Sequence, residues 1–387
     1  MHLLRSLVKS LRLTAEMTWA NFRAKGGKQP IVVIESDDWG SIRLRDRKTF
    51  ESLERKGLNP GRSPFNTFDC LERKEDLDSL LNVLEGIKTD TSYRPILTLN
   101  TVLCNPDFDR IQAADFENYY GESFLDSYRR YYGQNLTQTW QQGIASGLIL
   151  PQFHAREHLN VPLWMRDLKA GLAPTRVAFE HQFFGLRTKT SSPVQKHYVS
   201  AYSPESPDEL ATITGYTNEG LQSFEHVFGF RSKSFVGCNY VWPVALEPAL
   251  AEAGIAHFQT RQKSFSPDPS RQGSRDIRRH YTGELNGLGQ SFGVRNVFFE
   301  PYLDRKKDWV STALAQIKSA FNLRAPAIVC THRINYCSHI DPKLSGISLA
   351  MLETLIRKII RYWPETKFLS SAGLADHLQL TQSGTRH

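Results

Sequence analysis

Two adjacent carboxylates, Asp37 and Asp38, lie just after an apolar run of four β-branched residues at 31–34. Two polar residues, at 35–36, separate the run from the pair. Such an apolar run is typical of a strand buried on both faces in a parallel sheet. The carboxyl ends of parallel strands are where α/β proteins gather their active sites. Two neighbouring aspartates can both stay ionised in a pocket when a cation relieves their repulsion. The pair therefore indicates a metal site, and a solvated Asp-Asp turn is the alternative.

Two histidines with metal-ligand spacing, His154 and His158, follow a second apolar segment. If the chain turns helical after Phe153, this spacing places both imidazoles on one face, where they can reach one ion. Two histidines and one aspartate leave coordination positions open for water and substrate, as a catalytic metal requires. A third buried-strand pattern, at 327–332, ends in His332.

This order of motifs resembles the metal-dependent polysaccharide deacetylases of the chitooligosaccharide deacetylase-like superfamily. The matching segments read Glu-Ser-Asp-Asp at 35–38 and His-Ala-Arg-Glu-His at 154–158, where the family has Thr-Phe-Asp-Asp and His-(Ser/Thr)-x-x-His. The chemical residues match while their neighbours differ, which indicates a divergent branch. The resemblance spans roughly residues 30–375. It implies an α/β fold, a distorted (β/α) barrel of the polysaccharide-deacetylase type with insertions.

The resemblance also implies an activity, the hydrolytic removal of an acyl group, N-acetyl above all, from a carbohydrate. It assigns Asp38, His154 and His158 to a divalent metal, with zinc expected. The metal lowers the pKa of its water and polarises the amide carbonyl. In this scheme Asp37 is the general base and His332 protonates the departing amine.

An arginine is expected to complete the site. The segment 230–237 occupies the position of the family's Arg-x-Pro-(Tyr/Phe)-Gly motif, whose arginine orients the catalytic aspartate. The resemblance implies that role for Arg231, although this version is longer and lacks the proline. An exposed arginine at a strand end is the alternative. The family motif that tunes the final histidine has only an imperfect counterpart at 304–309, so the partner of His332 stays open.

Two other kinds of protein are consistent with parts of the pattern. A glycoside hydrolase barrel would use two carboxylates and would have no need of His154 and His158. A catalytically idle carbohydrate-binding barrel would have no need of Asp37 beside the ligand. Both remain alternatives to the deacetylase.

The composition describes an ordinary globular protein with an uneven charge. The chain has 387 residues, 40% hydrophobic and 23% charged, enough for one large barrel with insertions or for two domains. The net charge is +8, and residues 1–28 contribute +5 of it. Because no basic, aromatic-interleaved stretch recurs in the rest of the chain, we expect no nucleic-acid partner.

The N-terminal segment has a pattern of its own. Residues 2–24 read as a basic amphipathic helix, which either lies on an anionic membrane surface or packs against the barrel or a partner chain. Basic residues interrupt the apolar region that a signal peptide would need. Five cysteines without a Cys-x-x-Cys pair favour buried reduced thiols. These features favour a cytoplasmic protein. If the basic helix binds the membrane, the contact is expected to be peripheral and at its inner face.

The chain divides into three parts by this reasoning. Residues 1–29 form the basic helix, 30–378 the catalytic barrel, and 379–387 a disordered tail. Within the barrel, the aromatic-rich segment 106–147 resembles an insertion, either a lid over a sugar site or a packed helical pair. The segment 262–290, rich in Ser, Arg and Gly, is expected to be a mobile loop.

Overall fold

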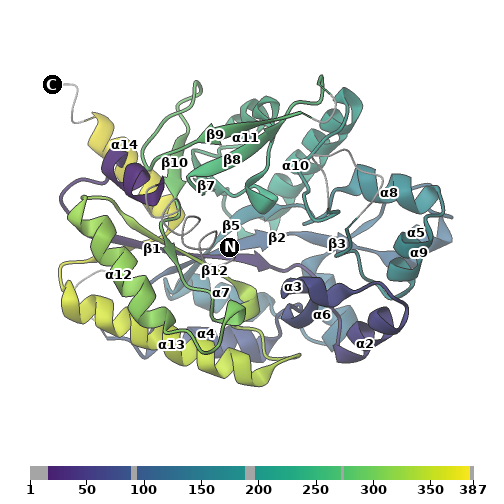
Figure 1. Ribbon diagram of the computed structural model, residues 1–387, viewed down its shortest axis with the longest axis horizontal. Coiled ribbons are helices and arrows are strands. Elements are labelled where there is room, and N and C mark those ends of the chain that lie inside the picture. The colour runs from purple at the N-terminus through teal and green to yellow at the C-terminus, as the bar shows by residue number, and fades with distance from the viewer. Residues whose placement is uncertain (1–15, 89–93, 188–196, 272–273, 384–387) are drawn as a thin grey trace, which may run out of the picture.

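A curled parallel sheet organises the molecule in the computed structural model, which describes residues 16–88, 94–187, 197–271 and 274–383 (Figure 1). The strand order is β10-β7-β6-β5-β2-β1-β12-β11, with β13 also pairing β1. The strands are β1 (Ile31–Trp39), β2 (Leu97–Val102), β5 (Ile149–Ala155), β6 (Ser234–Phe235), β7 (His257–Thr260), β10 (Ser291–Val294), β11 (Val297–Phe298), β12 (Ala327–His332) and β13 (Lys367–Leu369). Their pairings are all parallel.

The two ends of this sheet are joined by one short stretch of chain. The backbone N–H of Arg295 donates to Thr260 on β7 at 2.8 Å, and the N–H of the next residue, Asn296, donates to Ile328 on β12 at 3.1 Å. Residues 295–296 thus bridge the β7 side and the β12 side of the sheet. The sheet closes irregularly there, and the predicted distorted (β/α) barrel with insertions is confirmed.

The central strand, β1, shows how side chains are sorted between the barrel interior and the surrounding helices. Val32 and Ile34 belong to the main hydrophobic core, whereas Ile31 and Val33 pack with Ile328 and with α14 (Ser371–Ser383) in a separate small cluster. Successive strand residues point to opposite faces. The same alternation directs Glu35 and Asp37 into the interior toward the mouth of the barrel.

Helices cover the outside of the sheet. On one side α12, α13, α4 and α7 lie in a row, each in contact with the next (Figure 1). They are α4 (Lys74–Glu85), α7 (Thr137–Ala145), α12 (Trp309–Asn322) and α13 (Pro342–Tyr362). Opposite them, α10 (Pro207–Phe228) packs on β5 and on α11 (Glu247–Glu252). These helices bury the outward faces of the strands.

A second hydrophobic cluster lies beside the barrel mouth and packs independently of the main core. It contains Phe50, Phe108, Trp164 and Phe179. The shorter helices that surround it are α2 (Arg47–Arg55), α3 (Phe65–Phe68), α5 (Phe108–Ala113), α6 (Phe124–Tyr132), α8 (Val161–Lys169) and α9 (Ala173–Glu180), with a hairpin of β3 (Cys104–Pro106) and β4 (Gly121–Ser123). These loop-borne elements extend the molecule past the strand ends, to the right in Figure 1.

Two expectations about irregular segments were wrong. The segment 262–290 contains an antiparallel hairpin, β8 (Lys263–Pro267) and β9 (Arg275–Arg279). Its polar composition hid the alternation because β9 is largely exposed, with no apolar face to bury. Residues 379–383 of the expected tail complete α14, which is held by Leu374 and Leu378 in the barrel interior. Residues 384–387 lie outside the described part.

The described part of the N-terminal segment packs against the barrel. Residues 16–23 are helical, and residues 1–15 lie outside the described part. Asn21 is buried and accepts a hydrogen bond from Asn296 at 2.8 Å, while Glu16 pairs with Lys263. On the outer face, Trp19 is 39% exposed and Phe22 is 77% exposed. Among the described helices, none has the length and apolar character to cross a bilayer.

Candidate active site

A break in the alternation of β1 brings two consecutive carboxylates to the same cavity. Asp38 has a positive φ of 75°, and the pairing with β2 shifts register between Ser36 and Trp39. In a regular strand neighbouring side chains point to opposite faces, so one aspartate would face away. The left-handed conformation costs a non-glycine residue energy and is commonest at functional sites. Asp37 and Asp38 therefore both line the mouth of the barrel.

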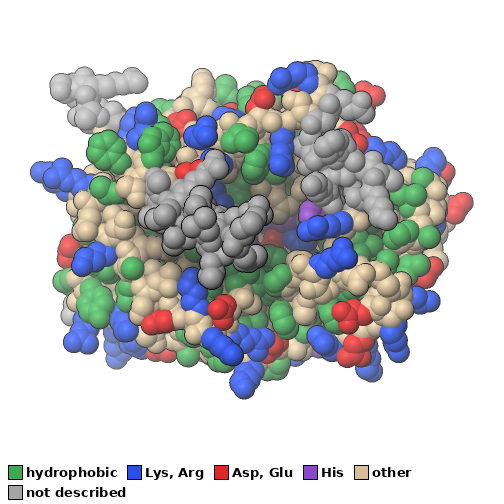
Figure 2. Space-filling model, viewed as in Figure 1, with side chains coloured by type: hydrophobic (Ala, Val, Ile, Leu, Met, Phe, Trp, Pro, Cys, Tyr) green, Lys and Arg blue, Asp and Glu red, His purple; other side chains and the backbone are tan. Residues whose placement is uncertain are grey.

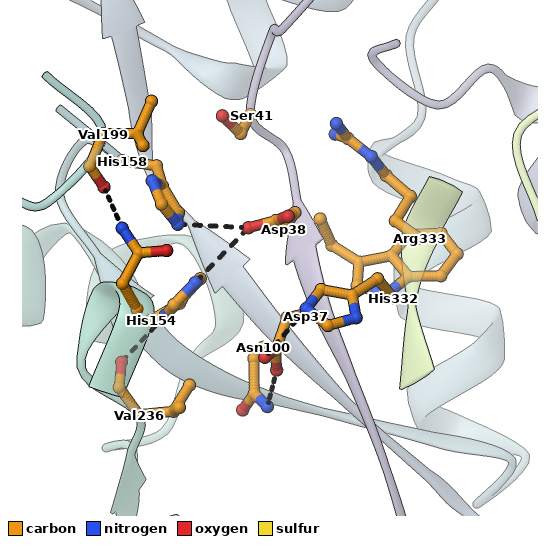
Figure 3. Close-up of polar contacts among 12 residues, drawn as sticks. Asp37, Asp38, Ser41, Asn100, His154, His158, Val199, Val236, His332 and Arg333 are labelled. Carbon is orange, nitrogen blue, oxygen red and sulfur yellow. Dashed lines mark hydrogen bonds and ion pairs between the residues drawn. The ribbon is translucent and has the colours of Figure 1, made fainter. Parts of the chain in front are cut away.

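Both histidines of the His-x-x-x-His motif reach Asp38, but not from a helix. His154 is on β5, and His158 lies in the loop that follows, before α8 begins at Val161. The helical expectation was wrong because β5 continues through Ala155. Asp38 Oδ1 lies 3.4 Å from Nε2 of His154 and 3.4 Å from Nε2 of His158 (Figure 3).

These distances and the tautomer of His154 are compatible with a metal. Two ligand atoms, each about 2.1 Å from a tetrahedral zinc ion, lie about 3.4 Å apart. His154 Nδ1 lies 2.8 Å from the carbonyl oxygen of Val236 and donates to it, since a carbonyl can only accept. His154 Nε2 then carries the lone pair, on the side of Asp38 Oδ1, and is available to a metal. A second partner of this kind is usual for metal-bound histidines.

His158 is held differently. Arg43 Nη2 lies 3.1 Å from His158 Nδ1, and because a guanidinium only donates, Nδ1 must accept. The proton is then on Nε2, directed at Asp38, so metal binding through Nε2 requires Arg43 to release Nδ1. Arg43 Nε and Asp69 Oδ2 are both buried without a partner, 3.9 Å apart. A small movement of Arg43 toward Asp69 would satisfy both atoms and free His158.

Burial and neighbouring charges set the protonation of these groups. Burial opposes ionisation of Asp38, but His158, His154 and Arg43 outweigh it and hold its pKa well below the usual range. Burial, with Arg43 adding to it, lowers the pKa of His158 well below its ordinary value. Metal ligands must be a deprotonated carboxylate and neutral imidazoles, which is the state these shifts favour.

A potential sulfur ligand that the sequence analysis missed, Cys238, lies in the same place. One ligand atom each of His154, His158 and Cys238 lies within 4.8 Å of the other two. Burial raises the pKa of the Cys238 thiol, and Asp38 adds to this. Cys238 follows β6 without any metal-binding spacing, so no sequence signal pointed to it.

Arg295 makes the contacts that were expected of Arg231. Its Nη1 and Nη2 donate to the two oxygens of Asp37 at 2.6 and 2.7 Å, and its Nε donates to Glu35 at 2.6 Å. Asn100 donates to Asp37 at 2.7 Å. Burial opposes ionisation of Asp37, but Arg295 outweighs it and lowers its pKa to about 2. Asp37 therefore stays a carboxylate at any ordinary pH.

Arg231 itself lies away from the site. Its side chain is 64% exposed and pairs with Glu225 at 3.0 Å. The motif alignment placed it wrongly because β6 is only two residues long and starts after Arg231, at Ser234. Arg295 had no motif to mark it. Arg295 reaches Asp37 because it belongs to residues 295–296, which close the barrel.

His332, at the end of β12, faces Asp37 from the next strand. Its Nε2 lies 3.8 Å from Asp37 Oδ2, and its Nδ1 lies 2.6 Å from Glu300 Oε1. Burial opposes the charged imidazolium, but Glu300 outweighs it and raises the pKa of His332 to about 10. Glu300 is the partner left open by the sequence analysis. Cys330 lies with Glu300 and His332 in a second potential ligand cluster.

A large cavity opens over these groups. Its volume is about 1250 Å³, and its lining includes Asp37, Asp38, His154, His158 and His332. Figure 2 shows the corresponding hollow, with blue Lys and Arg side chains around it. Residues 106–147 do not contribute to its lining. Their aromatic rings, such as Phe124 and Trp140, pack in the core, which favours the packed-helix interpretation over the lid.

No protein-family model and no curated protein matches the chain. Among solved structures, it is similar to a protein described as a polysaccharide deacetylase from Mycobacterium smegmatis, with TM-score 0.45 and 10% identity over 92% of both chains. It is similar to the α-amylase AmyC of Thermotoga maritima, with TM-score 0.44 and 9% identity over 90% of this chain and 74% of that one. A CE4 family pseudoenzyme from Bacillus anthracis has TM-score 0.38 and 10% identity, over 91% and 67%. These weak likenesses do not distinguish between activities, so the function is argued from the side chains.

Proposed function

We propose that the protein is a metal-dependent hydrolase that removes an acyl group, N-acetyl above all, from a carbohydrate. The observation that carries this proposal is the position of Asp38 Oδ1, 3.4 Å from Nε2 of both His154 and His158 at a cavity that also receives Asp37 and His332. Asp38, His154 and His158 are the proposed ligands, and zinc is the proposed metal.

The proposed chemistry divides the proton transfers between two groups. A bound divalent metal supplies Lewis acidity, which activates water and polarises the carbonyl. Asp37 takes the proton of the attacking water, and His332, protonated at neutral pH, gives its Nε2 proton to the departing amine nitrogen. With a pKa of about 2, Asp37 holds its proton only briefly and returns it to His332, 3.8 Å away. Glu300 keeps the imidazole oriented throughout.

The lining of the cavity argues against a glycoside hydrolase. Glycosidases place two carboxylates on either side of the scissile bond, about 5 to 9.5 Å apart. Among the described residues that line the cavity, Asp37 and Asp38 are the only carboxylates, and they are adjacent in the chain. Asp37 is moreover bound by Arg295 on both oxygens, which suits neither a glycosidic nucleophile nor a general acid.

Metal analysis combined with two product assays tests the proposal. We expect about one divalent metal per chain, and acetate release from a panel of N-acetylated glycans that stops with a chelator and returns with added zinc. Release of new reducing ends without acetate would assign the chain to the glycosidases. Bound metal with glycan binding but neither product would assign it to the idle barrels.

We also propose peripheral contact with an anionic membrane from the cytoplasmic side, through residues 2–24. The exposed Trp19 and Phe22, with Arg23 beside them, support it, since such side chains anchor interfacial helices. Ala20 and Asn21 are buried on the barrel, so within the described residues 16–23 only the outer face is open to a membrane.

A further inference from the structure

The cavity over the candidate active site is lined by more positive than negative charge. Its lining includes Arg43, Arg62, Arg187 and Arg261, against Asp37 and Asp38 as its only carboxylates among the described residues. Four arginines against two aspartates leave an excess of two positive charges before any metal is counted. A metal and a protonated His332 would add to that excess.

Both carboxylates already have cationic partners. Asp37 is bound by Arg295, and Asp38 lies 3.8 Å from Arg43. Arg43 in turn lies 3.9 Å from Asp69, behind the cavity wall. The charges of Asp37, Asp38 and Arg43 are therefore compensated within the protein. The remaining excess belongs to the other three arginines.

Other exposed arginines form ion pairs with N–O distances within 4.0 Å. Among the described residues, Arg62, Arg187 and Arg261 have no carboxylate partner within that distance. All three are exposed at the cavity, and like charges around one cavity repel one another. Their mutual repulsion is relieved when an anion enters. Guanidinium groups bind phosphate and carboxylate through two parallel hydrogen bonds.

Of these three arginines, Arg261 is the one that aromatic contacts connect to the proposed catalytic groups. Its guanidinium carbon lies 4.8 Å from the ring centroid of Tyr240 and 5.3 Å from that of Phe298. The Tyr240 hydroxyl accepts from Arg295 at 2.9 Å, and Arg295 holds Asp37. These cation–π contacts, with a hydrogen bond to Tyr240, hold the guanidinium in place. A guanidinium has five N–H donors, so others remain for a ligand.

The other two arginines line the same cavity from other segments, residues 57–66 and 185–187. Arg62 lies three residues before Phe65, whose ring lies 5.2 Å from the His332 ring. Arg187 follows Gly185, whose carbonyl accepts from Asn66 at 2.7 Å. Both arginine side chains are exposed at the cavity. Exposed cations at a mouth attract a charged ligand over a distance of about 10 Å.

We propose that the substrate is an N-acylated sugar that carries an acidic group, phosphate or carboxylate, which Arg261 binds beside the candidate active site while Arg62 and Arg187 attract it at the mouth. This inference rests on the proposed function for the N-acyl group. The acidic group is inferred separately, from the arginines.

Equilibrium binding of three matched probes to the metal-loaded protein tests the inference. They are N-acetylglucosamine 1-phosphate, N-acetylmuramic acid, which carries a carboxylate, and the neutral methyl glycoside of N-acetylglucosamine. Calorimetric titration should show at least one acidic probe binding about tenfold or more tightly than the neutral one, the effect of one or two charge-assisted hydrogen bonds. Which acidic probe gains distinguishes phosphate from carboxylate.

Variants locate the site. Arg261→Gln should remove most of the tenfold preference and Arg261→Lys should keep part of it, because a lysine retains the charge without the paired donors. The matched control is Arg231→Gln, an exposed arginine away from the cavity, which should keep the full preference. Thermal melting of each variant checks folding, and the lysine variant serves if the glutamine variant does not fold.

The inference is overturned if the neutral probe binds as tightly as both acidic ones, or if neither acidic probe binds. It is also overturned if Arg261→Gln retains the preference, as an anion held by the metal alone would. Acetate release is measured in parallel. A preference that depends on Arg261 without any acetate release would contradict the proposed function and leave the anion site standing.

Discussion

Asp37 and Asp38 are neighbours in the chain with different surroundings. Asp38 faces two imidazole nitrogens, whereas Asp37 accepts three short hydrogen bonds from Arg295 and Asn100. A carboxylate whose oxygens are already bound by a guanidinium is poorly placed to ligate a metal. Substitutions of Asp37 and of Asp38 should therefore abolish activity for different reasons.

At this scale we predict that Asp38→Ala loses metal and turnover together, whereas Asp37→Asn keeps its metal. Loss of a general base lowers the rate by about a hundred- to ten-thousand-fold. Metal content by elemental analysis and acetate release on the same samples check the prediction. Since the amide of the Asp37→Asn variant leaves part of Arg295 without its acceptor, the melting temperature is measured alongside. Near-normal turnover of a metal-loaded Asp37→Asn protein would contradict the mechanism.

Among the elements, β7 carries a buried histidine that makes the barrel sensitive to acid. His257 is fully buried, its Nδ1 lies 2.8 Å from the hydroxyl of Ser291 on β10, and its Nε2 has no partner. Burial lowers the pKa of His257 to about 3 from its ordinary 6.5. Below pH 6.5 the His257 imidazole binds a proton in the unfolded chain but stays neutral in the folded chain. Stability is therefore lost progressively as the pH falls from 6.5 toward 3.

We predict that this one site lowers the free energy of unfolding by about 2 kcal/mol between pH 7 and pH 5. Urea unfolding at the two pH values measures the loss. His257→Gln cannot take up the proton, so its stability should fall by correspondingly less over this interval, whatever its stability at pH 7. His226→Gln, an exposed position on α10, is the control and should keep the pH dependence of the natural chain. An unchanged loss in His257→Gln would contradict the assignment.

At the scale of the whole molecule, the N-terminal segment combines contacts with the barrel and a concentration of positive charge. The contacts described between this segment and the barrel involve Glu16 and Asn21, so removing residues 2–15 spares both residues. This deletion removes three of the six Lys and Arg residues in 1–28. Each basic residue near an anionic surface contributes about 1 kcal/mol to binding.

We predict that the protein lacking residues 2–15 binds phosphatidylserine vesicles much more weakly, by vesicle co-sedimentation, with its melting temperature and turnover of a water-soluble substrate little changed. Phe22→Ser, at a 77% exposed position, should weaken vesicle binding without loss of stability. Neutral phosphatidylcholine vesicles are the control. Equal vesicle binding by the shortened chain would leave the packed helix as the whole role of this segment.

The sequence by itself determined the features that a local residue pattern encodes. Apolar runs identified β1, β2 and β12, and the polar residues at their ends identified Asp37, Asp38 and His332, since parallel strands end at one rim. His154 and His158 were identified by spacing, although their backbone is a strand end and a loop. The hairpin of β8 and β9 was missed because β9 is exposed and β8 buries mainly small polar side chains, so no apolar pattern marks either strand.

The tertiary structure alone decided which distant residues complete the site. Arg295 reaches Asp37 because residues 295–296 close the barrel, and Arg231 is excluded because β6 starts after it. Glu300 meets His332, and Cys238 meets the two histidines, across separations that no motif spans. Local pattern records burial and backbone geometry, which act over a few residues. Partnership across a barrel depends on strand order and register, which arise only when the whole sheet has closed.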